Sequence, residues 1–260
     1  MNITQFFTLP AVASSHGHEV DFIIYIIHYL MLILLIGWGS FFIYVLFRFN
    51  KKRNPTADYL GVRSHASSTI EVLLVIIETI LLAGFSIPFW NKQVNAFPQR
   101  SDTVEVRLIA VQFAWNFHYP GADGVFGKTD YQYFDKQSNP LGIDPNDPQG
   151  KDDFSTINQL HLPIGKPAII YLSSKDVIHS FGVNSMRVKQ DVIPGMIIPT
   201  WFTPTKTGQY EIACSQLCGI GHYSMRGFLT VHSQEDYDQW FSQQASSSGE
   251  EEGGGDDFWN

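Results

Sequence analysis

Two long apolar runs constrain this chain more than any other feature of its sequence. Residues 22–47 read FIIYIIHYLMLILLIGWGSFFIYVLF without a charged side chain, and residues 70–90 form a second run that contains Glu71 and Glu78. At about 1.5 Å of helix per residue, each run can cross a hydrocarbon core about 30 Å thick. The sequence therefore predicts a hairpin of two transmembrane helices. A cleaved signal peptide is not expected, because the first run is too long and no basic segment precedes it.

The loop between the runs, residues 48–69, predicts the orientation of the hairpin. It holds five Lys and Arg side chains against Asp58 alone. Because loops rich in Lys and Arg stay on the cytoplasmic side, we expect this loop in the cytoplasm of a bacterium. The outer N-terminal segment, residues 1–21, and all that follows residue 90 are then expected on the periplasmic side of the inner membrane.

The part of the chain beyond residue 90 is acidic. Residues 91–260 carry 12 basic and 20 acidic side chains, which accounts for the whole net charge of −8, whereas residues 1–90 carry five of each. An acidic surface repels phosphates, so a nucleic-acid partner is not expected. The same surface would attract a basic protein.

Short β-rich runs separated by Gly and Pro follow the second apolar run. They include TVEVRLIA, KPAIIYLSS, GQYEIA and RGFLTVHS. Such a texture is typical of an all-β sandwich or barrel, here expected over residues 100–240. Residues 121–154, with seven Asp and three Lys, are expected as an insertion that is either an ordered surface excursion or mobile. Residues 241–260 are expected to form an acidic, low-complexity tail.

The only two cysteines, Cys214 and Cys218, lie in the segment CSQLCGIGHYSMRG beside His222 and Met225. A disulfide between them would close a very small loop and leave the His and Met unexplained. Zinc could take a Cys₂His₂ set, but the C-x₃-C spacing is not the usual one and a thioether does not serve zinc. Copper accepts thiolate, thioether and imidazole, so it suits the whole set best.

Two bridging thiolates would hold two copper ions, and such a site needs a second imidazole from another loop. Candidates outside the membrane part are His118, His161, His179 and His232. His179 is favoured, because SSKDVIHSFGV places it directly after a strand-like run, where a loop at the end of a sheet is expected.

The motifs DVIHSF, VKQDVIPG and CSQLCGIGHYSM resemble subunit II of the haem–copper cytochrome c oxidases, and the similarity runs from about residue 22 to residue 231. The resemblance implies a two-helix transmembrane hairpin followed by a cupredoxin-like β-sandwich with a dinuclear copper centre, CuA. It implies that Cys214 and Cys218 bridge two copper ions. The remaining ligands it implies are His179 and Met225 for one copper, and His222 with the main-chain carbonyl of Gln216 for the other.

The resemblance also implies a function. The chain would accept electrons from a c-type cytochrome and pass them to the haems of oxidase subunit I, where oxygen is reduced and protons are pumped. It would contact other oxidase subunits too, and it would not itself reduce oxygen. Two alternatives keep parts of this pattern: a membrane-anchored copper carrier, and a quinol-oxidising relative, which usually lacks the copper ligands.

Some positions depart from the family or carry further expectations. The family usually has Glu at Gln216, where the side chain helps to hold magnesium at the subunit I contact, so magnesium is doubtful here. Phe113 stands where the family has the Trp that receives electrons, and Trp115 remains nearby. Glu71 matches a glutamate near the mouth of a proton path, although a simple solvated glutamate is the alternative. Glu78 replaces a common Pro and is expected to face another subunit, hydrogen-bonded or protonated.

Overall fold

The computed structural model describes residues 9–56, 59–61, 64–135 and 138–247. The chain divides into two compact units, which are treated separately below. One is Glu19–Ala96, and the other combines Met1–His18 with Phe97–Asn260.

Two long helices make up the first unit. Helix α2 spans Gly17–Arg48, and the second helix is continuous through three labelled parts: α3 (Ala66–Leu81), the π-helical turn η1 (Leu82–Ser86) and α4 (Ile87–Asn95). Both helices are long and apolar enough to cross a membrane, and both extend beyond the predicted runs 22–47 and 70–90 at each end. Within this unit their apolar side chains are exposed, as for Leu35 at 71% and Phe42 at 62%. Such surfaces suit lipid or another protein, not water.

The π-helical turn has a local cause in Pro88. Proline has no N–H to donate to the carbonyl four residues earlier, that of Gly84, and its ring would clash with that carbonyl. The helix widens just before the proline, so that the N–H of Ile87 bonds to the carbonyl of Leu82, five residues back. The second helix thus continues past a residue that would otherwise break it.

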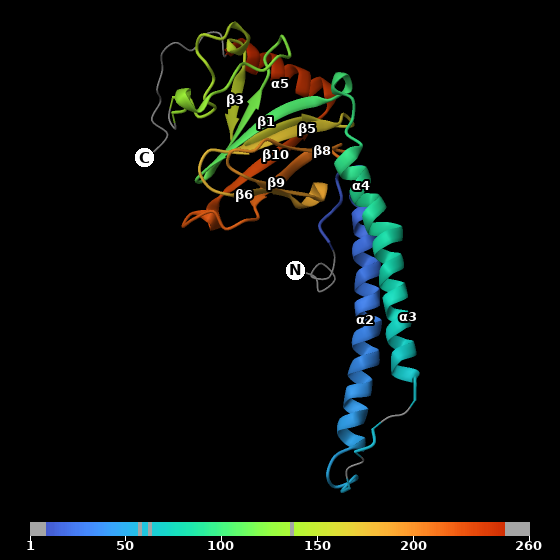
Figure 1. The fold of residues 1–260 in the computed structure, drawn as a ribbon. Coiled ribbons are helices and arrows are strands. Elements are labelled where there is room, and N and C mark those ends of the chain that lie inside the picture. The colour runs from blue at the N-terminus through green and yellow to red at the C-terminus, as the bar shows by residue number, and fades with distance from the viewer. Residues whose placement is uncertain (1–8, 57–58, 62–63, 136–137, 248–260) are drawn as a thin grey trace. The chain divides into compact units, whose positions relative to one another are not determined.

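The second unit is a β-sandwich of two five-stranded sheets, which face each other in Figure 1. The orders are β3-β2-β1-β5-β8 in one sheet and β4-β10-β9-β6-β7 in the other. The strands are β1 (Val104–Val111), β2 (Ala114–Tyr119), β3 (Phe154–Ile157), β4 (Gln159–Pro163), β5 (Ala168–Ser174), β6 (His179–Val183), β7 (Val188–Val192), β8 (Ile198–Phe202), β9 (Gly208–Cys214) and β10 (Arg226–His232). The predicted fold class is confirmed: two apolar helices precede a cupredoxin-like sandwich. The four predicted strand runs correspond to β1, β5, β9 and β10.

Alternating side chains of the two sheets fill the space between them. On β1, Val106, Leu108 and Ala110 are fully buried, while the residues between them point to the other face of the sheet. Large side chains from both sheets complete this core: Trp115, Phe117, Tyr119, Leu160, Leu162, Ile170, Leu172, Phe181 and Ile212. The core gives the strand ends and loops around it a rigid base.

A C-terminal helix that the sequence analysis did not predict closes one end of the sandwich. Helix α5 (Gln234–Ser247) begins after Ser233, whose hydroxyl accepts a hydrogen bond from the N–H of Asp236 (3.1 Å) as an N-cap. Trp240 stacks on His161 with ring centroids 4.2 Å apart. The predicted boundary between domain and tail, at 240/241, therefore falls inside a packed helix; the rest of the expected tail lies outside the described residues.

The segment before α2 also belongs to the sandwich. The N–H of Ala13 donates to Ser185 O (2.8 Å), and the N–H of Thr205 donates to Ala13 O (2.8 Å). The hydroxyl of Ser14 donates to Met186 O (2.7 Å), and Val12, Ala13 and Ser14 are buried. The residues just before the first helix are thus held against the β-domain.

The insertion 121–154 is an ordered surface excursion over the residues described. Its end is held by Asp153, which is buried, contacts the His118 ring at 2.5 Å and accepts a hydrogen bond from Gly127 N (2.8 Å). A bridge between Thr129 and Ile143 closes the excursion on itself.

Candidate metal centre

Three neighbouring strands bring the candidate ligands to one end of the sandwich. His179 is the first residue of β6, Cys214 is the last residue of β9, and residues 215–225 form the loop from β9 to β10. Strands β6 and β9 pair so that Phe181 lies opposite Cys214, which fixes His179 beside the loop. The sequence analysis expected His179 on a loop at a sheet end; it lies at a sheet end, but within the strand.

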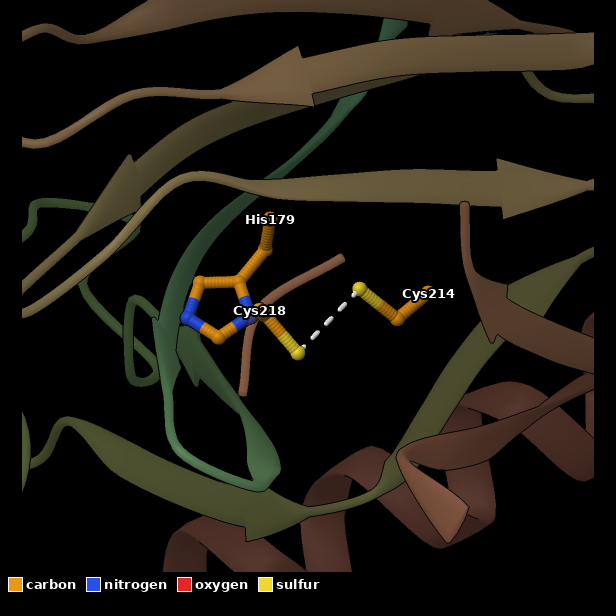
Figure 2. Close-up of side chains that lie close together, drawn as sticks. All are labelled: His179, Cys214 and Cys218. Atoms are coloured by element: carbon orange, nitrogen blue, oxygen red, sulfur yellow. Dashed lines mark hydrogen bonds between the residues drawn. The ribbon is translucent and has the colours of Figure 1, made fainter. Parts of the chain in front are cut away.

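His179, Cys214 and Cys218 converge, as Figure 2 shows. Their ligand atoms all lie within 4.8 Å of one another. The two sulfur atoms are 3.8 Å apart and both cysteines are free thiols. The disulfide interpretation is therefore not what the structure describes.

The other predicted donors lie around the same two sulfurs. Cys218 Sγ is 3.6 Å from His222 Nδ1 and 3.7 Å from Met225 Sδ. Cys214 Sγ is 3.2 Å from the main-chain oxygen of Gln216. All six predicted donors thus meet in one place, although the side chain of Gln216 itself is exposed.

Asp176 holds the ring of His179 in the orientation that a metal needs. Its Oδ1 lies 2.9 Å from His179 Nε2, while the buried Nδ1 of the same ring has no hydrogen-bond partner among the described residues. With the proton on Nε2 shared with the carboxylate, Nδ1 is left with a free lone pair. The buried Nδ1 of His179, beside two thiols, is therefore available to coordinate a metal ion.

The same carboxylate also fixes the neighbouring loop. Asp176 Oδ2 accepts from Gln112 N (2.7 Å), and the Gln112 side chain donates to Cys218 O (2.6 Å). Burial acts to raise the pKa of Asp176, but hydrogen bonds from His179, Gln112 and Val177 outweigh it and leave the pKa below its ordinary value. Asp176 is therefore charged at neutral pH and ties both sides of the site together.

Cys218 is buried, and without metal its environment favours the neutral thiol. Burial, together with the adjacent thiol of Cys214, raises the pKa of Cys218 to about 11. A metal must displace that proton to bind the thiolate. Soft sulfur donors combined with imidazole fit copper, and thioether and thiolate together argue against a hard metal ion.

Two of the remaining predicted residues, Phe113 and Trp115, lie beside this cluster, and the other two, Glu71 and Glu78, belong to the other unit. Phe113 is half-buried against the metal loop, where a Cβ on Gly221 would come within 2.5 Å of its ring. Trp115 is fully buried, and its ring meets His179 edge-on at 6.0 Å. Glu71 and Glu78 are exposed on α3, in the other unit.

Three of the four candidate histidines do not join the site. The ring of His118 contacts the Asp153 carboxylate, and His161 Nδ1 lies 2.7 Å from His232 Nε2, under Trp240. These three are structural histidines in the sandwich. Conversely, the sequence analysis assigned no role to Asp176 or Gln112; the only signal was the D-x-x-H spacing, three residues before His179.

Comparisons with known proteins identify one family of relatives. Residues 104–231 match the family model described as cytochrome c oxidase subunit II, periplasmic domain. The alternative cytochrome c oxidase subunit 2 of Bradyrhizobium diazoefficiens is 35% identical over 79% of this chain and 73% of its own length. A probable cytochrome c oxidase subunit 2 of Rickettsia felis is 29% identical over 90% of this chain and 69% of its own. Among solved structures, the periplasmic domain of cytochrome oxidase subunit II of Bradyrhizobium japonicum covers 55% of this chain and 94% of its own, with 27% identity and a TM-score of 0.41.

Proposed function

Since this chain belongs to the cytochrome c oxidase subunit II family, we propose that it is the electron-accepting subunit of a membrane-bound oxidase. It takes single electrons from a c-type cytochrome and passes them to the haems of subunit I, where oxygen is reduced and protons are pumped. The observation that carries the proposal is the meeting of four donors, two imidazoles, a thioether and a main-chain carbonyl, around the two free cysteine sulfurs.

The residues of the site have separate tasks in this proposal. Cys214 and Cys218 would hold two copper ions together, with His179 and Met225 as further ligands for one, and His222 with the carbonyl of Gln216 for the other. When bound, such a pair supplies one-electron redox chemistry. Asp176 orients His179, and the rigid sandwich beneath holds the ligand positions constant, which keeps reorganisation small when an electron arrives or leaves.

Electrons are proposed to enter on the side of Phe113. This ring is partly exposed and lies against the metal loop, whereas Trp115 is enclosed in the core and supports the ring of His179. Apolar side chains of the same loop are exposed: Leu217 at 78%, Ile220 at 94% and Tyr223 at 91%. Exposed apolar groups of this kind suit contact with another protein, either a further oxidase subunit or the donor.

Magnesium at the subunit I contact stays doubtful in this proposal. A neutral amide at Gln216 provides one weak oxygen where a carboxylate would provide charge. We expect copper binding to survive this difference, because only the main-chain oxygen of Gln216 faces a cysteine sulfur.

The orientation proposed is that both termini and the metal domain face the periplasm, with residues 48–69 in the cytoplasm. It is supported by residues 12–16, which pack onto the sandwich, so the segment before α2 and the β-domain lie on one side of the membrane. Two transmembrane helices between these segments return the chain to the same side of the membrane. Glu71 is then near the cytoplasmic end of the second helix, at the proposed entrance of a proton path, and Glu78 lies deeper in the span.

The test is metal analysis and electron paramagnetic resonance of the full chain purified in detergent. Two copper ions per chain that share one unpaired electron are expected, and Cys218→Ser should abolish that signal. His18→Gln, which removes an exposed imidazole outside the cluster, should keep it. A single exchangeable copper would favour the carrier alternative, and zinc would overturn the proposal.

For Glu78 the test is Glu78→Gln in the assembled oxidase. We expect slower proton uptake or impaired assembly, because an ionisable group within a membrane span is retained at a cost. Unchanged assembly and unchanged proton uptake would refute a role for this carboxylate.

A further inference from the structure

A cavity of about 520 Å³ lies on the outer face of the sheet, away from the metal ligands. Its floor consists of outward-facing side chains of β1 and β5, and its wall is the start of the insertion, residues 124–129. The volume falls within the range of about 300–1,000 Å³ typical of small-molecule sites.

The cavity is cationic, although the domain around it is acidic. It is lined by Arg100, Arg107 and Lys175 against one carboxylate, Glu105, so three positive charges less one negative leave +2. Residues 91–260 as a whole carry 12 basic and 20 acidic side chains. Glu105 already neutralises Arg100, since its Oε1 is 3.1 Å from Arg100 Nε. The surplus charge is that of Arg107 and Lys175.

Neither of those two cations forms an ion pair with a carboxylate among the described residues, although the charges of Asp153 and Glu105 act on Arg107 and that of Asp130 acts on Lys175. Across the described parts of the chain, no carboxylate lies within 4.0 Å of Arg107 or Lys175. Arg107 donates one hydrogen bond, from Nη1 to Gly127 O (2.9 Å), which leaves other N–H groups of its guanidinium available. Burial lowers the pKa of Arg107 and of Lys175, so both charges are held partly out of water.

Aromatic rings hold the two cations in place. The Arg107 guanidinium lies 4.3 Å from the ring centre of Phe126, and Lys175 Nζ lies 5.8 Å from that of Tyr131 and 5.4 Å from that of Phe134. These contacts fix the positions of both charges before any ligand arrives, which lowers the entropic cost of binding. The apolar side chains of Val125 and Ile197 also line the cavity and suit a carbon skeleton.

From this arrangement we propose that the cavity binds a small organic anion that carries a phosphate or carboxylate group. In this proposal both Arg107 and Lys175 attract the anionic group, and the carbon part contacts Val125 and Ile197. The hydroxyl of Tyr171, which also lines the cavity and accepts from Arg100 Nη2 (2.8 Å), can donate its own proton to the anion.

The test is isothermal titration calorimetry of the full chain in detergent, at neutral pH and constant ionic strength. Phenyl phosphate and succinate are the probes, because they separate phosphate from carboxylate recognition. We expect one of them to bind at one site per chain. Lys175→Gln should weaken that binding about tenfold, since a charge-assisted hydrogen bond is lost.

Two further variants make the result decisive. Lys189→Gln removes an exposed lysine of β7 outside the cavity and should leave the affinity unchanged. Arg107→Gln should weaken binding as Lys175→Gln does, and circular dichroism checks that each variant keeps its fold. The proposal is overturned if neither probe approaches saturation at about 10 mM. It is equally overturned if both cavity variants, correctly folded, bind as the unmodified chain does.

Discussion

Replacement of Asp176 by Asn should cost copper affinity without removing a copper ligand. Every polar partner of this carboxylate is a donor. Oδ1 accepts from Val177 N (2.7 Å) and Ser174 Oγ (3.3 Å) and faces His179 Nε2 (2.9 Å), and Oδ2 accepts from Gln112 N (2.7 Å). An amide has one oxygen and one NH₂ group. In either orientation, the NH₂ group of the substituted side chain would therefore face at least one N–H.

The size of the loss in copper affinity depends on which hydrogen bond of Asp176 is lost. If the amide oxygen stays with Gln112, the NH₂ group faces His179 Nε2, and the ring avoids the clash only by moving its proton to Nδ1. A protonated Nδ1 cannot bind metal. Loss of such a supporting group typically lowers metal affinity by about 10- to 100-fold, or about 1.4–2.7 kcal/mol.

The assay is a competition titration of copper between the full chain and a chelator of known affinity. Asp102→Asn is the control, because it removes an exposed carboxylate of the same domain in the turn Arg100–Asp102, outside the metal site. The control should bind copper as the unmodified chain does. If Asp176→Asn, shown to be folded, bound copper within about twofold of the unmodified chain, the reasoning about the tautomer would be refuted.

Three other predictions concern stability and docking. Burial, and then the charge of His232, lower the pKa of His161 to about 4. Between about pH 6.5 and pH 4 the unfolded chain therefore binds a proton at this histidine that the folded chain does not, and the melting temperature should fall as the pH falls through that range. His161→Phe should make this fall smaller. Trp240→Ala removes the ring that stacks on His161 and should lower the free energy of unfolding by roughly 3 kcal/mol in denaturant titrations, whereas unchanged stability would mean that α5 does not support the sandwich. Electron uptake from a basic c-type cytochrome, measured by stopped flow, should slow as the ionic strength rises from about 0.01 M to about 0.15 M. The reason is that the screening length shrinks from about 30 Å to about 8 Å. A rate independent of salt would point to a tethered donor.

Much of the fold could be predicted from local patterns. The apolar runs indicated two helices because a long apolar stretch is visible without any tertiary contact, and β1, β5, β9 and β10 have clear β-rich sequences. The short strands β6, β7 and β8 have five residues each and no regular alternation, so they depend on their neighbours in the sheet. Helix α5 was missed because its apolar face is narrow, comprising Tyr237, Trp240 and Phe241, and an acidic low-complexity segment follows it.

The candidate site was predictable in its ligands but not in its support. The spacing from Cys214 to Met225 identifies donors, because the ligand types themselves limit the metal. The contact of Asp176 with His179 is local and follows the D-x-x-H spacing, but the contacts of Gln112 with Asp176 and Cys218 depend on distant segments meeting in space, which no sequence spacing encodes. The same holds for the cavity at Arg107 and Lys175, residues 68 positions apart on adjacent parallel strands and the loop that follows.

The docked segment before α2 has a consequence for any attempt to work with the sandwich alone. A soluble fragment cut near Phe97 would lose Val12 and Ala13 from its surface and would expose the core beneath them. It would also leave the carbonyls of Ser185 and Met186 without the donors that Ala13 and Ser14 supply. A fragment with residues 9–16 fused back onto it should melt at a higher temperature, because these contacts would be restored. The β-domain is thus completed by a segment that lies before both helices in the chain.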